Sequence, residues 1–247
     1  MSGLGTGDIA LLCLAAVLSG FAKTAIGGVG SISVAVFAAV LPAKESTGAL
    51  LPLLIVGDVF AVRAYRRHTD WAALRRLFPS VAAGVLAGAG FVAWVGDAGM
   101  RRTIGGVLLA LTAVHLARRW RARGQPQLAR PHRAAAPFFG LLAGFTTMVA
   151  NAGGAVMSLY LLSSGYAKLG FLGTGAWFFL LVNTFKVPFS AGLGLITADS
   201  LRLDAALVPA VVAGALIGRR VVAHLNGAVF ERLVLLFTVA SSVNLLL

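Results

Sequence analysis

The sequence of 247 residues has few of the side chains that carry catalytic and metal chemistry. It contains one cysteine, Cys13, four histidines and eight acidic residues. A single cysteine excludes an internal disulfide and a multi-cysteine metal site. The sequence shows no histidine and carboxylate grouping at metal-ligand spacing, no nucleophile beside a base and no phosphate-binding loop. We therefore expect no catalytic residue, no metal and no cofactor.

Charge of either sign is also scarce. Charged residues make up 12% of the chain and hydrophobic residues 59%, and the mean hydropathy is +0.90. The apolar residues form runs of about 17 to 22 residues, the length of a helix that crosses a bilayer. Short segments that alternate in polarity, as in a membrane β-barrel, are absent. The sequence predicts an all-α polytopic membrane protein.

The net charge of +13 comes largely from two arginine clusters. They are "RAYRRHTDWAALRR" at 63–76 and "RRWRARGQPQLARPHR" at 118–133. In a soluble protein this charge would suggest a nucleic-acid partner. Between apolar runs it is typical of loops on the cytoplasmic face of a membrane. We expect the bilayer, and no nucleic acid, as a partner.

The apolar runs divide into two similar halves. The expected boundaries are 1–117 for a first transmembrane repeat, 118–135 for a basic cytoplasmic loop and 136–247 for a second repeat. The expected segments lie at 7–22, 27–41, 46–64, 76–95, 101–117, 136–150, 153–163, 170–190, 204–222 and 230–246.

Three pairs of matching stretches indicate a duplication. "PSVAAGVLAGAG" at Pro79 aligns with "PAVVAGALIGRR" at Pro209, and "GFAKTAIGGVG" at Gly20 with "GFTTMVANAGG" at Gly144. A weaker pair is "TGALLPLLIVGD" at Thr47 and "TGAWFFLLVNTF" at Thr174. Their order is the same in both halves, which chance explains poorly.

The charge pattern favours opposite orientations for the two halves. Residues 7–41 are too long for one span, and a glycine-rich break divides them into two short helices that form either a re-entrant hairpin or a broken span. A hairpin at 136–163 places Lys168, Arg219 and Arg220 on the arginine-rich inner side, as the positive-inside rule requires. We predict two inverted-topology repeats, each opening with a Gly-broken helix, and both termini outside.

The two glycine-rich breaks are the strongest candidates for a binding site. They contain Gly27 and Gly28 in the first half and Gly153 and Gly154 in the second. Corresponding breaks in two repeats point to a transporter's central site, where helix N-termini aim N–H groups at an anion. The alternative is close helix packing. Packing suffices for four other glycines, Gly84, Gly88, Gly214 and Gly218.

Lys23 adds a cation to the first break. A charge within the membrane is costly, so it indicates a functional site unless the lysine reaches the interface. Thr24, Ser31, Thr147 and Asn151 could add neutral donors, or could bond local carbonyls. Because Thr147 takes the place of the lysine in the second break, we expect an anion site with a single lysine.

Three further polar residues fall inside predicted spans. Asn183 and Lys186 precede Pro188, and either could bind the anion or satisfy a carbonyl that the proline frees. Lys186 lies near the span end, where its head group would reach the interface. Asp58 is the candidate for proton coupling, although an ion pair with Arg63 or Arg66 is the favoured role.

At these residues the sequence resembles the sulfite exporter TauE/SafE family. The resemblance is carried by "GFAKTAIGGVGS", by Leu41 to Trp71, by "GFTTMVANAGGAVMSLYLLSSG" and by "GTGAWFFLLVNTFKVPF". It implies a multi-pass permease of the bacterial inner membrane that exports small anions such as sulfite or organosulfonates, coupled to the proton gradient. A passive anion channel is the alternative, and a membrane-embedded enzyme a weaker one. The expected partner is the small anion, and a homodimer is left open.

Overall fold

The protein is all-helical throughout the part of the chain that the structure describes. This computed structural model describes residues 4–25, 29–100, 135–226 and single positions at 102, 103, 106, 110, 113 and 229. Its helices are α1 (Thr6–Thr24), α2 (Gly30–Val40), α3 (Ala43–Tyr65), the 3-10 turn η2 (Arg66–His68), α4 (Trp71–Trp94), α6 (Ala135–Ala150), α7 (Gly153–Ser163), α8 (Lys168–Gly192) and α9 (Ala198–His224).

Five of these helices are long and apolar enough to cross a bilayer: α1, α3, α4, α8 and α9. The helices α2, α6 and α7 are shorter and apolar. The predicted segments match these helices to within a few residues, apart from a longer α4 and α9. The predicted segments 101–117 and 230–246, and the boundary loop at 118–135, lie largely outside the described residues.

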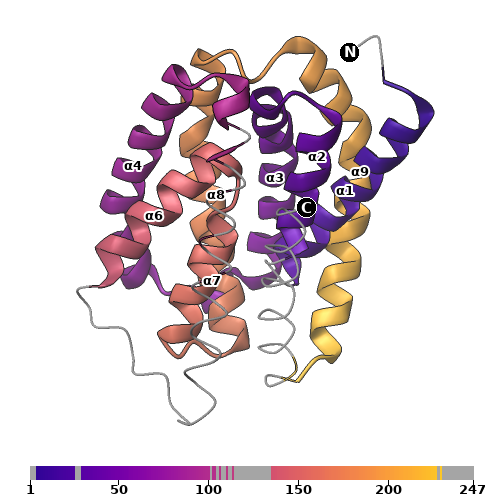
Figure 1. The fold of residues 1–247 in the computed structure, drawn as a ribbon. Helices are drawn as coiled ribbons and strands as arrows, with labels where there is room; N and C mark the ends of the chain where they lie inside the picture. Colours follow the sequence, from indigo (N-terminus) through magenta and orange to yellow (C-terminus); the bar gives the residue numbers. More distant parts are fainter. Residues whose placement is uncertain are drawn as a thin grey trace.

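The helices form two outer pairs around a central pair. α1 packs along α9 on one side and α6 along α4 on the other, while α3 and α8 contact each other between them (Figure 1). The members of each outer pair run in the same direction. Gly214 of α9 meets Val17 of α1, and Gly218, one turn later, meets Phe21 and Thr24. In the other pair, Gly84 of α4 meets Leu141 of α6, and Gly88 meets Phe145 and Met148.

Glycines bring the members of each outer pair into backbone contact. A Cβ added to Gly20 would meet the carbonyl of Val211, and one added to Gly214 would meet the carbonyl of Val17. The same contacts recur in the other pair, where Gly144 meets the carbonyl of Val81, and Gly84 that of Leu141. The prediction that these α4 and α9 glycines serve close packing is confirmed, because a side chain would separate the helices.

One end of the helix bundle is strongly basic. Gly173 at the start of α8 lies against the backbone of Tyr65 and His68, and Lys168 donates to the carbonyls of Val222 (3.2 Å) and Leu225 (2.6 Å). The ends of α3 and α9 and the starts of α4 and α8 therefore lie together. Among the described residues, the charged ones at this end are Arg63, Arg66, Arg67, Asp70, Arg75, Arg76, Lys168, Arg219 and Arg220.

Asp70 fixes the loop before α4 at this basic end. Its Oδ1 accepts from the N–H of Ala73 (3.0 Å) as a helix N-cap, and its Oδ2 accepts from the Tyr166 hydroxyl (2.6 Å). The hydrogen bond from Tyr166 is the main cause that lowers the pKa of Asp70 below its ordinary value. The carboxylate is therefore ionised at neutral pH, and its negative charge interacts favourably with the positive, N-terminal end of the α4 dipole.

The opposite end carries acidic and basic residues together. The N–H of Lys44 donates to Asp97 Oδ1 (2.9 Å), which joins the start of α3 to the end of α4. Gly48 in α3 lies against the backbone of Leu195, just after α8. Asp8, Glu45, Asp199 and Arg202 lie at the starts of α1, α3 and α9, at the same end of the bundle.

We expect Gly20→Ala to destabilise the protein by about 1–3 kcal/mol, because the new methyl group would force α1 away from the α9 backbone. The matched control is Gly90→Ala, where a Cβ meets no atom within 4 Å. That control should gain roughly 0.5–1 kcal/mol as an exposed helical substitution. Thermal unfolding in detergent measures both, and equal stability of the two variants would contradict the packing described.

Candidate functional site

Two pairs of helices end and begin again near the centre of the bundle. α1 ends at Thr24 and α2 begins at Gly30, while α6 ends at Ala150 and α7 begins at Gly153. The second reversal is made by Asn151, whose φ of 49° is left-handed and whose N–H bonds the carbonyl of Thr147 (3.0 Å). This is the αL cap of a helix C-terminus, with asparagine in the place that glycine more often takes.

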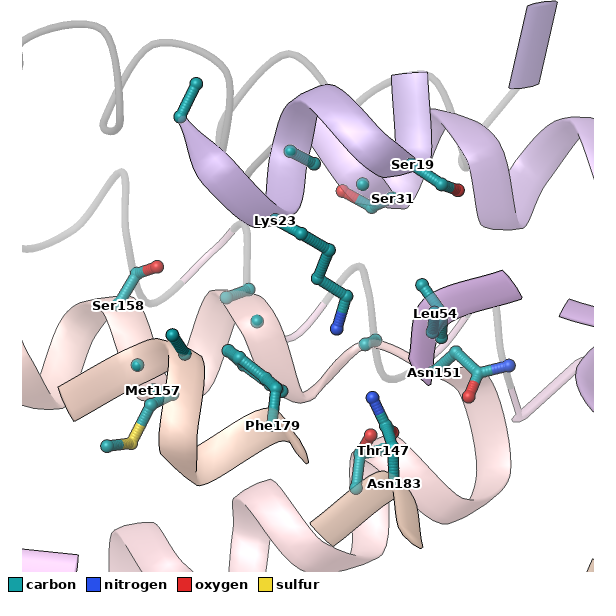
Figure 2. A pocket seen from close by; sticks show the side chains of 18 of the residues that line it. Ser19, Lys23, Ser31, Leu54, Thr147, Asn151, Met157, Ser158, Phe179 and Asn183 are labelled. Atoms are coloured by element: carbon teal, nitrogen blue, oxygen red, sulfur yellow. The ribbon is translucent and has the colours of Figure 1, made fainter. Parts of the chain in front are cut away.

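A cavity of about 70 Å³ lies where the two reversals meet. At about 10–15 Å³ for each water molecule in this measure, it has room for roughly five to seven waters or for one small ion. Lys23 extends across it from α1 toward Phe179 and Asn183 (Figure 2). The polar residues of its wall are Ser19, Lys23, Ser31, Thr147, Asn151, Ser158 and Asn183.

Lys23 is held against α3 and α8. Its stem lies over Gly57, where an added Cβ would be 2.9 Å from Cγ of the lysine. Its Nζ lies 2.8 Å from Asp58 Oδ1 and 4.4 Å from the centre of the Phe179 ring. The side chain is 12% exposed, and it lines the cavity. Lys23 therefore presents a cation to the cavity while a carboxylate and an aromatic face hold it in place.

Asp58 is fully buried behind Lys23. Asn183 Nδ2 donates to its Oδ2 at 2.6 Å, so both carboxylate oxygens face a donor. The favoured ion pair of Asp58 with Arg63 or Arg66 is wrong, because both arginines are exposed and the partner is Lys23. That interpretation used neighbours along one helix, whereas the partner comes from α1.

Lys186 lies on the other side of the cavity wall and is 1% exposed. Its Nζ donates to the carbonyl of Thr147 (2.6 Å) and to Asn151 Oδ1 (2.6 Å), with Thr147 Oγ1 at 3.5 Å. The interpretation of Lys186 as an interfacial lysine is therefore wrong. Its position three residues after Asn183 places it on the inner face of α8, facing the end of α6.

This second lysine also corrects the expectation of a single-lysine site. Thr147 does replace the lysine of the first break, but α8 brings another ammonium group to the same place. Neither Asn183 nor Lys186 bonds a carbonyl freed by Pro188, since both side chains turn toward the site.

The model of one protein family, Sulfite exporter TauE/SafE, matches residues 12–245 of the chain. The chain belongs to the sulfite exporter TauE/SafE family. The resemblance found in the sequence is thus confirmed, and with the five long apolar helices it makes the protein a multi-pass membrane protein of a family of anion-exporting permeases. No curated protein and no solved structure matches the chain.

The structure of this TauE/SafE member brings most of the predicted site residues together. Lys23, Ser31, Thr147, Asn151, Gly154 and Asn183 line the cavity. Asp58 and Lys186 lie directly behind its wall. Thr24 does not line it, because its hydroxyl donates to the carbonyl of Ala215 in α9 (2.8 Å). Gly153 packs its α-carbon against Thr147 and Ala143. Gly27 and Gly28 lie outside the described residues.

Among the cavity residues that were not predicted are two serines, Ser19 and Ser158, and Phe179, whose ring lies against Lys23. Each lies four residues from a predicted site residue on the same helix, Ser19 before Lys23, Ser158 after Gly154 and Phe179 before Asn183. Residues at this spacing share a helix face. Extending each candidate by one helical turn would have found them.

We expect Asn151→Ala to destabilise the protein more than Asn151→Gly. Both variants lose the bonds of the side chain to Lys186 Nζ and to the carbonyl of Thr47 (3.0 Å). The alanine variant also forces a Cβ into the left-handed region, at a further cost of roughly 1 kcal/mol. Thermal unfolding of the two variants in one detergent measures the difference. An alanine variant as stable as the glycine variant would contradict the αL cap.

Proposed function

We propose that the protein is a secondary transporter that binds a small anion in this cavity, with Lys23 as the residue that contacts it. The observation that carries the proposal is the position of the Lys23 ammonium at the cavity wall where two helix reversals meet. A small cavity with a held cation suits an ion of a few heavy atoms. Substrate-binding roles for Ser31, Thr147, Asn151, Gly154 and Asn183 are part of the proposal.

Two helix N-termini add to the attraction. Gly30 and Ser31 at the start of α2, and Gly154 and Ala155 at the start of α7, line the cavity. The aligned peptide dipoles give the N-terminal end of a helix a partial positive charge. An anion in the cavity would lie near the positive ends of both short helices, which is the usual way a helix binds phosphate-like groups.

The proposed architecture is two inverted repeats. α1 and α2 contact each other along their lengths and reverse direction at their break, as do α6 and α7. α1 starts near the end of the bundle that holds Asp199, whereas α6 starts beside the start of α4 at the basic end (Figure 1). Re-entrant hairpins that enter from opposite sides account for this arrangement and for the repeated glycine contacts. The division at 118–135 stays a prediction.

The direction proposed is export across the bacterial inner membrane. The positive-inside rule places the basic end in the cytoplasm. The residues of α8 that line the cavity extend from Asn183 to Phe171, and Phe171 lies close to the basic end. From α3, the cavity wall includes Leu54. An anion would thus enter from the cytoplasm. Sulfite or an organosulfonate is the proposed substrate, with coupling to the proton gradient through Asp58, and assembly as a homodimer stays a prediction.

The packing favours a carrier over a passive anion channel. On the side of the cavity away from the basic end, Leu50, Leu51 and Leu53 of α3 are all buried. A channel needs a continuous polar path, whereas a carrier needs one closed side at a time. Flux that saturates with substrate would agree with the carrier, and substrate turnover by purified protein would instead favour an enzyme.

The proposal is tested by measuring anion flux into proteoliposomes that contain the Lys23→Met variant. We expect a loss of at least about 100-fold, because a desolvated ion pair with the substrate disappears. The matched control is Lys44→Met, which removes the same charge from a half-exposed position at the opposite end of the bundle. Flux of the Lys23 variant equal to that of the control would remove Lys23 from the mechanism.

A further inference from the structure

The charged groups around the cavity do not balance. Lys23 and Lys186 provide two ammonium groups, and Asp58 provides one carboxylate. Both oxygens of Asp58 face donors, which suits the ionised form. Three oxygen atoms surround Nζ of Lys186, one for each N–H of an ammonium group. With both lysines protonated and Asp58 ionised, these side chains carry a surplus of one positive charge.

The helix N-termini that attract the anion add only partial charges to this sum, and the helix C-termini beside them offset part of that contribution. Each reversal brings the C-terminus of one helix beside the N-terminus of the next, so partial charges of opposite sign lie close together. The C-terminal carbonyls of α6 are themselves partly neutralised, since the carbonyl of Thr147 accepts from both Lys186 Nζ and the N–H of Asn151. The surplus of the ionised side chains remains the main charge that a bound anion meets.

We propose that the loaded site is electrically neutral, so that a monoanion binds alone and a dianion binds together with one proton, which Asp58 takes. This inference rests on the proposed function and specifies its charge. Charges withdrawn from water require a compensating charge close by, and a second uncompensated negative charge is costly. A site that holds one surplus cation therefore accepts one net negative charge.

The geometry indicates how the proton is taken up. A dianion at the cavity wall contacts the Lys23 ammonium, which then shares or leaves Asp58 Oδ1. A proton from the water of the cavity bonds to that oxygen, and Asn183 Nδ2 continues to donate to Oδ2. One proton moves from solvent to carboxyl and no other bond changes. Anion and proton leave together when the site opens on the other side.

Asp58 is the group placed for this exchange. The charged and amide groups that face it are Lys23 from α1 and Asn183 and Lys186 from α8. Another buried carboxylate among the described residues is Asp204 in α9, which is 3% exposed and does not line the cavity. Asp204→Asn therefore removes one buried acid outside the site, and it serves as the matched control.

The experiment measures binding of methanesulfonate and sulfate to the full chain in detergent by calorimetry between pH 5 and 8. The two probes are both tetrahedral, differ by one charge and take up no protons near neutral pH. Methanesulfonate affinity should not change with pH. Sulfate affinity should rise by about tenfold for each unit that the pH falls, as uptake of one proton requires.

The variants separate charge from shape. Asp58→Asn should bind sulfate independently of pH and shift the sulfate-to-methanesulfonate affinity ratio toward sulfate by at least about tenfold. The double variant Lys23→Met/Asp58→Asn removes one positive and one negative charge, so the surplus of one positive charge remains. It should bind both anions more weakly because Lys23 is missing, yet still prefer methanesulfonate. Asp204→Asn should behave as the wild type. The preference of the site for the methyl group of methanesulfonate is the same in all variants, so it cancels when the affinity ratios of two variants are compared.

Three results would overturn the inference: sulfate affinity in the wild type that ignores pH, sulfate binding too weak to detect at every pH, or a pH dependence that persists in Asp58→Asn. If Asp58→Asn does not fold, the pH series on the wild type decides alone. A separate flux assay on the same protein keeps the two proposals apart: binding as expected without transport would contradict the proposed function and leave the charge rule intact.

Discussion

Backbone groups that a helix leaves unpaired inside a bilayer cannot bond to water, and this constraint organises the centre of the molecule. α1 and α6 both end among other helices. The carbonyl of Thr24 at the end of α1 accepts from the Tyr65 hydroxyl (2.8 Å), and that of Thr147 near the end of α6 accepts from Lys186 (2.6 Å). In each half, a long central helix thus supplies the donor that lets a shorter one stop. The cavity exists because both helices stop there.

The two halves meet this constraint with different chemistry. A neutral phenol from α3 bonds the first helix end, and an ammonium group from α8 bonds the second. The two halves also differ within the breaks, because Lys23 in the first break corresponds to Thr147 in the second. As a result, each half contributes one cation, but Lys23 lines the cavity while Lys186 supports its wall. Asp58 lies 2.8 Å from Lys23 and offsets one of these two cations when it is ionised.

The sequence was sufficient to predict the helices and most of the polar residues of the cavity wall. Runs of apolar residues located the helices, and the glycine-rich breaks located Lys23, Ser31, Asn151 and Gly154 at one place. These features are local, because hydrophobic length and helix breaking depend on neighbouring residues.

The partners of the charged residues could not be predicted in the same way. Asp58 was expected to pair along its own helix, yet Lys23 reaches it from α1 because Gly57 leaves room for the lysine stem. Lys186 was judged by its distance from a span end, but the face of α8 on which it lies decides its burial. The reversal after α6 depends on Asn151 in the left-handed region, which composition alone does not indicate.

The central claim is that a small anion binds against Lys23 between the two helix reversals. Anomalous diffraction at the selenium edge from crystals of the full chain soaked in selenate tests it most directly. We expect an anomalous peak in the cavity, within contact distance of Lys23 Nζ and facing Thr147 and Asn151. Peaks confined to the arginines at the basic end, with none beside Lys23, would contradict it.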